Sequence, residues 1–210
     1  MSSIVLTADT LLGTTPTIGS VEFDGKAFYA TAQGTQRGII PGAQFFRLNA
    51  DLAGANVATV QSVFGVSVTL STSTVYAFEA FYNLNKTVGA IALPTTVGFG
   101  FGGSATLNNI SYMALGFDGS ATLPTTGNGF RFSASASATN QTFSGSISST
   151  AVTLLATVKG VVSINGGGTF TPQYTLSAAP GGAYSTMANS YFLIYPIGAS
   201  GANISVGAWA

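Results

Sequence analysis

Apolar and polar residues alternate with a period of two through most of this chain, and no other feature constrains its fold as strongly. In residues 75–84, for example, aromatic and small apolar residues occupy every even position: Tyr76, Phe78, Ala80 and Tyr82. Successive side chains of a strand point to opposite faces, so this alternation predicts half-buried β-strands. Helical composition is confined to residues 49–58, where we expect at most a turn or two. The chain is therefore predicted to be all-β.

Turn-forming dipeptides separate the alternating segments. Asp24-Gly25, Asp118-Gly119 and Asn165-Gly166 favour hairpin turns, because both central residues of a type I′ turn need positive φ. Short strands spaced by turns predict a jelly-roll-like β-sandwich. The segments predicted to be strands are 22–32, 43–48, 66–70, 75–84, 90–101, 106–117, 130–137, 152–164, 170–176, 191–197 and 204–208.

The N-terminal residues differ from the rest of the chain. Residues 7–20 are rich in Thr, Gly and Leu, and residues 1–20 are predicted to be an extended arm. Residues 21–210 are predicted to be the β-sandwich domain, or two small β subdomains without a clear boundary. Leu11, Leu12 and Ile18 are too sparse to fold alone, so they are interface candidates that could dock on a neighbouring subunit or a sheet edge.

Charged residues are unusually few. They make up 6% of the chain, against about 25% in ordinary soluble proteins, and the net charge is zero. There is no run of Lys or Arg to neutralise phosphates, which argues against nucleic acid and anionic membranes as partners. No stretch approaches the ~20 apolar residues of a membrane helix, and the N-terminus lacks a secretory signal pattern. A weakly self-repelling surface of this kind suits a protein that packs against neighbours.

Chemical groups for catalysis are also scarce. The chain has no Cys and no His, which excludes thiolate ligands and the commonest general base. Gly98, Gly100 and Gly103 match the dinucleotide-binding spacing, but a strand is predicted after them where that motif requires a helix. Glu22 and Asp24 are interpreted as a solvated strand leading into a turn. We therefore expect no catalytic residue, no cofactor and no metal site, and hence no enzyme.

One carboxylate stands among apolar residues. Glu79 lies in an alternating strand and, if partly buried, is expected to form an ion pair with Arg47 or Arg131. Glycan cleavage by Glu22, Asp24 or Asp118 is disfavoured, because these acids are not clustered.

Aromatic pairs recur along the strands, at 28–29, 45–46, 81–82 and 191–192. Adjacent strand residues face opposite sides, so each pair should place one ring in the core and one outward. Aromatic residues are enriched at the centre of protein interfaces, and outward rings can also stack on sugars. The aromatic interface candidates are Tyr29, Phe46, Tyr82, Tyr191 and Trp209.

Several segments carry a resemblance to a known family. They are GIIPGAQFFRLN at 38–49, SVFGV at 62–66, TVYAFEA at 74–80, GTFTPQY at 168–174, SYF at 190–192 and GAW at 207–209. Together they resemble virion structural proteins of marine tailed phages, including phages of cyanobacteria, over Arg37 to Ala210.

The resemblance implies a component of the virion, made in the host cytoplasm, and it carries no catalytic residues. The leading interpretation is a capsid decoration or cement protein on the outer capsid surface, with the major capsid protein as partner and self-association as a homotrimer. The alternative is a tail or fibre module that binds a host glycan through outward aromatic rings.

Overall fold

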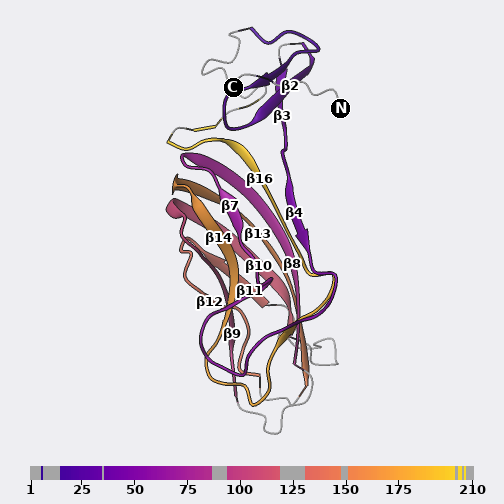
Figure 1. The fold of residues 1–210 in the computed structure, drawn as a ribbon, viewed down its shortest axis with the longest axis vertical. Coiled ribbons are helices and arrows are strands. Elements are labelled where there is room, and N and C mark those ends of the chain that lie inside the picture. Colours follow the sequence, from indigo (N-terminus) through magenta and orange to yellow (C-terminus); the bar gives the residue numbers. More distant parts are fainter. Residues whose placement is uncertain are drawn as a thin grey trace.

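The computed structural model describes residues 15–34, 36–86, 94–118, 131–147 and 151–201, with Leu6, Asn203, Ile204 and Val206. These residues form sixteen β-strands and no helix, which confirms the all-β prediction. The helical turn expected at 49–58 is wrong, since that stretch holds a two-residue strand between bends. The molecule is elongated, with a small sheet at one end and a two-layer body below it (Figure 1).

The small end sheet, here called the head, is antiparallel. Its strands are β1 (Val21–Phe23), β2 (Phe28–Gln33) and β3 (Gln36–Ile40), in that order. A turn joins β1 to β2 at the predicted Asp24-Gly25, but Gly25 alone has positive φ, at +84°, so the type I′ geometry expected there is wrong. Asp24 Oδ1 accepts bonds from the N–H groups of Lys26 and Ala27, each at 2.7 Å. The predicted domain 21–210 therefore begins with a separate sheet, and the strands of the body begin only at Gln44.

The larger sheet of the body contains eight antiparallel strands. They are β4 (Gln44–Arg47), β5 (Leu52–Ala53), β8 (Thr74–Lys86), β10 (Thr106–Asp118), β11 (Arg131–Ser135), β13 (Val152–Gly166), β15 (Ser185–Thr186) and β16 (Tyr191–Ala199). The order begins β11-β10-β13-β8. On the far side of β8, β16 pairs with one half of the strand and β15 with the other, and β4 and β5 follow outside them.

The smaller sheet of the body contains five antiparallel strands. They are β6 (Gln61–Ser62), β7 (Val68–Leu70), β9 (Val97–Gly102), β12 (Gln141–Thr142) and β14 (Gly168–Leu176). The order is β12-β9-β14, with β6 and β7 along the other side of β14. The hairpin predicted at Asn165-Gly166 is wrong: the chain there passes from β13 in the larger sheet to β14 in the smaller one.

The core lies between these two sheets (Figure 1). Along β8 the even positions are buried and the odd positions are half-buried on the outer side, as the alternation predicted. The rings of Phe101 and Phe170 from the smaller sheet stack with centroids 4.7 Å apart, and Phe78 from β8 meets Phe101 edge-on at 5.0 Å. Burial of apolar side chains at about 1.5–3 kcal/mol each makes this aromatic layer the main stabilising contact between the sheets.

Candidate interaction surfaces

Strand β4 is an exposed apolar edge of the larger sheet. All four of its residues are exposed, with Phe45 at 60% and Phe46 at 39%. It leaves the head after Pro41-Gly42 and runs down the side of the body beside β16, which is its only strand partner in the described part of the chain (Figure 1). Exposed apolar edges are normally blunted or covered in natural proteins. A strand of this kind is therefore a candidate contact with another molecule.

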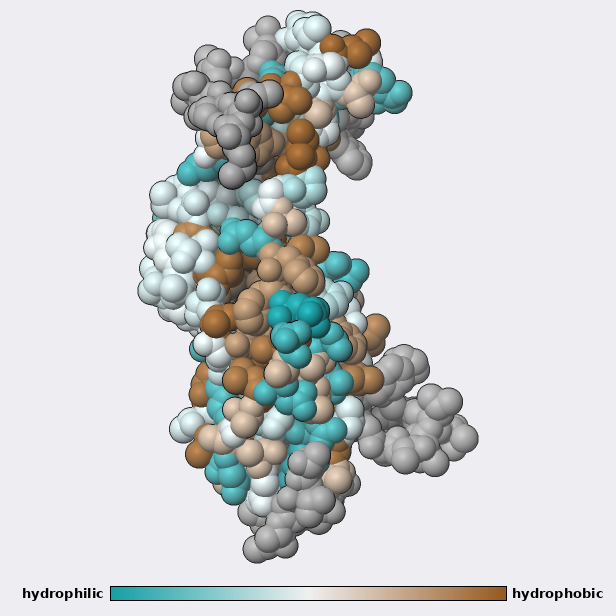
Figure 2. Space-filling model, turned by 45° about the vertical axis from the view of Figure 1, so that its right-hand side comes forward, coloured by the Kyte–Doolittle hydropathy of each residue, from teal (hydrophilic) through white to brown (hydrophobic). Residues whose placement is uncertain are grey.

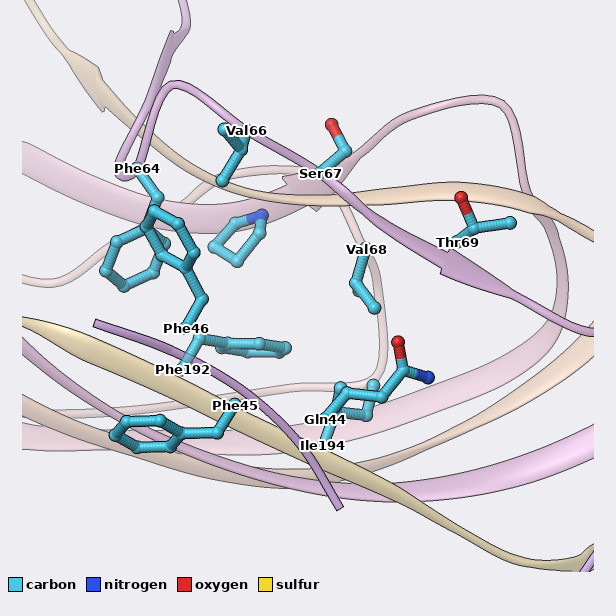
Figure 3. Close-up of a pocket in the computed structure, with 11 residues that line it drawn as sticks. Gln44, Phe45, Phe46, Phe64, Val66, Ser67, Val68, Thr69, Phe192 and Ile194 are labelled. Atoms are coloured by element: carbon cyan, nitrogen blue, oxygen red, sulfur yellow. The ribbon is translucent and has the colours of Figure 1, made fainter. Parts of the chain in front are cut away.

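A slot of about 310 Å³ opens behind β4, between the edges of the two sheets (Figure 3). Its aromatic wall combines Phe46 and Phe64, whose centroids lie 5.7 Å apart with the rings at 74°, and Phe192, 6.5 Å from Phe64. Figure 3 shows the Phe46 side chain directed toward Phe64 and the Phe192 ring directed across the slot toward Val68, while the Phe45 ring turns away from it. The full lining is Gln44, Phe45, Phe46, Phe64, Val66, Ser67, Val68, Thr69, Pro172, Phe192 and Ile194.

The slot is suited to bind an apolar side chain. Phe192 and Phe64 are buried, so the wall is held rigidly by the core, whereas Val66 at the rim is 46% exposed. The residues that line the slot are mainly aromatic and aliphatic, and none of them is charged. The volume is at the small end of the range for ligand sites, which suits one aromatic or two aliphatic side chains better than a large ligand.

Three aromatic rings form a ladder on the other side of β4, across the outer surface of the larger sheet. Phe45 on β4 lies 5.6 Å from Tyr191 on β16, and Tyr191 lies 6.4 Å from Phe81 on β8. The strand register explains both ring contacts, because Tyr191 is directly opposite Phe81 and is shifted by two residues from Phe45. The ladder leaves ring faces near solvent at the edge of the body.

The head has an apolar face as well. Val21 is 51% exposed, and Phe28 and Ile40 are each 40% exposed. Phe23 stacks on Phe28 with centroids 4.5 Å apart. Figure 2 shows hydrophobic surface on the head and in patches along the body, interleaved with hydrophilic surface. An exposed apolar face of this kind is a candidate contact with another molecule.

The opposite face of the head is polar and well paired. Arg37 forms an ion pair with Glu22 at 2.7 Å, and the Tyr29 hydroxyl donates to Asp24 at 2.8 Å. These bonds hold β1, β2 and β3 together. Glu22 and Asp24 thus have structural partners, in agreement with their interpretation as strand and turn residues.

Two of the predicted interface residues are buried within the protomer. Tyr29 is 3% exposed and Tyr82 is 1% exposed, so the rings of these pairs that face outward are Phe28 and Phe81. The expectation of one inward and one outward ring holds for both pairs, but the outward ring is the phenylalanine and not the predicted tyrosine. Tyr82 faces inward because it shares the even positions of β8 with the rest of the core.

The other predicted interface residues are placed as follows. Phe46 is exposed at the slot, and Tyr191 is half-buried in the ladder. Ile18 is 65% exposed, but the chain beside it is fixed, since Gly19 N–H donates to Thr31 O at 2.8 Å. The end of the predicted arm thus joins the head. Leu11, Leu12 and Trp209 lie outside the described residues.

Glu79 pairs with Lys159 at 3.3 Å and not with Arg47 as predicted, while the side chain of Arg131, the other predicted partner, lies outside the described part of the chain. The partner follows from sheet order, because Glu79 on β8 is directly opposite Lys159 on β13. Lys86, buried at the end of β8, donates from Nζ to Pro180 O at 2.6 Å. Neither contact follows from the sequence, because each joins residues that are far apart along the chain.

The glycine-rich segment is structural. Gly98 and Gly100 lie within β9, and strand β10 follows. A Cβ at Gly100 would come within 2.7 Å of Ala138 O, so glycine allows residues 138–141 to pack against β9. Among the described residues no three His, Cys, Asp or Glu side chains are grouped as metal ligands would be. Those residues also include no helix long and apolar enough to cross a membrane.

No protein-family model matches the chain, and a search of the curated proteins finds no similar sequence. Support for a function therefore comes from the surfaces of the chain itself and from the resemblance in its sequence.

Proposed function

We propose that this chain is a structural protein of a tailed-phage particle, attached to the outer capsid surface as a decoration or cement protein. The observation that carries the proposal is the exposure of all four residues of β4, with Phe45 and Phe46 on its two faces. The resemblance over residues 37–210 includes this strand. An apolar edge of this kind is a liability for a free protein and an advantage for one that is covered in an assembly.

The strand order supports a jelly-roll-like topology, a fold that occurs in viral capsid and lectin domains. In this chain the larger sheet contains the neighbours β4-β16-β8-β13, and the smaller sheet contains the neighbours β7-β14-β9-β12. These two groups of four strands correspond to the two halves of a jelly roll. The hairpin β10-β11 then extends the first sheet beyond β13.

Attachment would work by adhesion. A strand of the partner adds to the free edge of β4, and one of its apolar side chains enters the slot against Phe46 and Phe64. Burying that side chain contributes about 1.5–3 kcal/mol at each site. The proposed partners are the major capsid protein and further copies of this chain, which form a homotrimer.

The number of copies in a particle tests the proposed role. Quantitative mass spectrometry of purified particles should find hundreds of copies if the chain decorates the capsid. A few to tens of copies would contradict decoration and favour a tail or fibre component.

A substitution at the slot tests the proposed surface. Val66→Lys places a charge at the slot rim and should weaken co-sedimentation with particles stripped of the native protein by at least tenfold. Val60→Lys is the matched control, because Val60 is 50% exposed, close to the 46% of Val66, and does not line the slot. Equal binding by the two variants would exclude the slot as the attachment site.

A tail or fibre module that binds a host glycan is a second candidate, favoured by the ladder of Phe45, Tyr191 and Phe81. Ring faces near solvent can stack on sugar rings. A glycan array with the purified protein should then give hits that disappear in Phe45→Ser. An array without hits would leave decoration as the remaining proposal.

A further inference from the structure

An ion pair lies at the centre of the outer surface of the larger sheet. Glu79 and Lys159 face each other across β8 and β13, which form one of the two longest pairings of the sheet. Their cross-strand row continues to Leu193 and Phe45 on one side and to Met113 on the other. Two strands thus flank the pair on each side: β16 and β4 on one, and β10 and β11 on the other, where Met113 is opposite Ala134.

Apolar and polar side chains surround this pair. The row on one side contains Tyr191, Phe81 and Leu115, with Thr157 between Phe81 and Leu115 and Arg47 at the β4 end. The row on the other side contains Tyr195, Ala77 and Val161, followed by Ser111. Met113, Leu115 and Val161 are 44%, 45% and 41% exposed. We call this surface the outer face. Its apolar and aromatic residues are Phe45, Val75, Ala77, Phe81, Met113, Leu115, Leu155, Val161, Tyr191, Leu193 and Tyr195, and its polar and charged residues are Arg47, Glu79, Asn83, Asn109, Ser111, Thr157, Lys159 and Ser163.

The outer face is large enough for a stable contact. Five strands at about 4.8 Å spacing and nine residues of β8 at about 3.4 Å rise give roughly 700 Å². A standard protein interface covers about 800 Å² on each partner. The face has the anatomy of such an interface, with apolar and aromatic residues and little charge.

We infer that the outer face packs against the outer face of a second copy of this chain, about a two-fold axis that passes between Glu79 and Lys159. A two-fold interface brings the same surface of both subunits together, so residue i meets j and j meets i. Glu79 then lies over Lys159 of the second copy, and Lys159 over Glu79 of the second copy. The four charges alternate in sign around the axis.

Charge complementarity is the reason to choose a second copy as the occupant. The centre of the face carries one acid and one base side by side, so it is complementary to its own image after a two-fold rotation. Two sheets packed in this way lie about 10 Å apart with strands aligned within about 30°. The contact goes beyond the proposed function, because it adds a two-fold interface to the trimer that the resemblance implies.

Val161→Lys tests the contact by placing a charge on the apolar part of the outer face. The mass of the assembly is measured by sedimentation equilibrium at about 100 μM, well above the micromolar dissociation constants of weak interfaces of this area. We expect the substitution to halve the mass, from dimer to monomer or from hexamer to trimer. Circular dichroism confirms folding, and Met113→Lys is the second variant if Val161→Lys does not fold.

Val60→Lys is the matched control, since Val60 has the same side chain, is 50% exposed against 41% for Val161, and lies neither at the slot nor on the outer face. It should leave the two-fold contact intact. A wild-type protein that is monomeric at this concentration, or an assembly whose mass Val161→Lys leaves unchanged, would overturn the inference. Particle binding is read separately, by co-sedimentation, so the failure of one proposal does not entail the failure of the other.

Discussion

Tyr82 and Tyr112 are both buried in the core, but their hydroxyl groups have different surroundings. The Tyr112 hydroxyl donates to Phe99 O at 3.0 Å. No hydrogen-bond partner for the Tyr82 hydroxyl lies within reach in the described part of the chain. A buried polar group without a partner loses its hydration and gains nothing in return.

The two tyrosines should therefore respond in opposite directions to replacement by phenylalanine. Tyr82→Phe is expected to raise the free energy of unfolding by about 1 kcal/mol, because the unpaired hydroxyl is removed. Tyr112→Phe should lower it by about 1 kcal/mol, because Phe99 O loses its donor. Urea unfolding of both variants measures the difference. A loss of stability in Tyr82→Phe would mean that a buried water satisfies its hydroxyl.

Between pH 5.5 and 11.5 the stability should change only at the alkaline end. The absence of His leaves no ordinary titration between about pH 5.5 and 7.5, so the free energy of unfolding should be flat there. Burial raises the pKa of Tyr174 and Tyr184 to about 12, above the value of 10 in the unfolded chain. The unfolded state then loses its protons first, and the stability is lost as pH rises from 10 toward 12.

Denaturant titrations from pH 5.5 to 11.5 measure this profile. Tyr174→Phe should make the alkaline decline shallower. A change in the midpoint between pH 5.5 and 7.5 would reveal a strongly shifted carboxyl group instead.

At the scale of elements, Gly160 allows three strands of the larger sheet to pack closely, because it has no side chain. It lies in β13 between β8 and β10. A Cβ there would come within 2.6 Å of the Phe78 ring and of Ser111 O. Glycine thus lets the rings of Phe78 and Tyr112 approach β13 from its two neighbours.

Gly160→Ala should therefore be destabilising, by about 1–3 kcal/mol, as is typical of overpacking in a core. Gly42→Ala is the control, because a Cβ at Gly42 meets nothing within 4 Å and its φ is not positive. Thermal unfolding of the two variants should differ clearly. Equal midpoints would mean that β13 can shift away from β10 without loss.

At the scale of the whole molecule, self-association should be insensitive to salt. The chain has only twelve Asp, Glu, Lys and Arg residues, and the exposed surfaces described are mainly apolar. Salt screens charge–charge attraction and has little effect on apolar contacts. Sedimentation in low salt and in ~1 M salt, where the screening length is about 3 Å, should give the same assembly. Dissociation in high salt would show that charges, and not apolar area, hold the copies together.

Local sequence determined the long strands of the body and which of their residues share a face. It missed the two-residue strands β5, β6, β12 and β15, and the strand predicted at 204–208 is wrong for its described residues Ile204 and Val206. The period of two in β8 separates Tyr76 and Phe78 from Val75 and Ala77, because side chains alternate along any strand. The Asp24-Gly25 turn was likewise predictable, since its backbone bonds involve residues only two or three apart. These features depend on neighbours in the sequence, which is why they can be read from it.

Only the tertiary structure decided which face is buried and which edge is open. Tyr82 was assigned to an interface although it lies in the core, because alternation defines two faces without saying which one meets the second sheet. Asn165-Gly166 has hairpin chemistry, yet the chain crosses there to the other sheet. The exposure of β4 depends on its pairing with β16, about 150 residues later in the chain. Contacts between such distant segments follow from the packing of the whole chain, and therefore the slot, the ladder and the outer face emerged only with the fold.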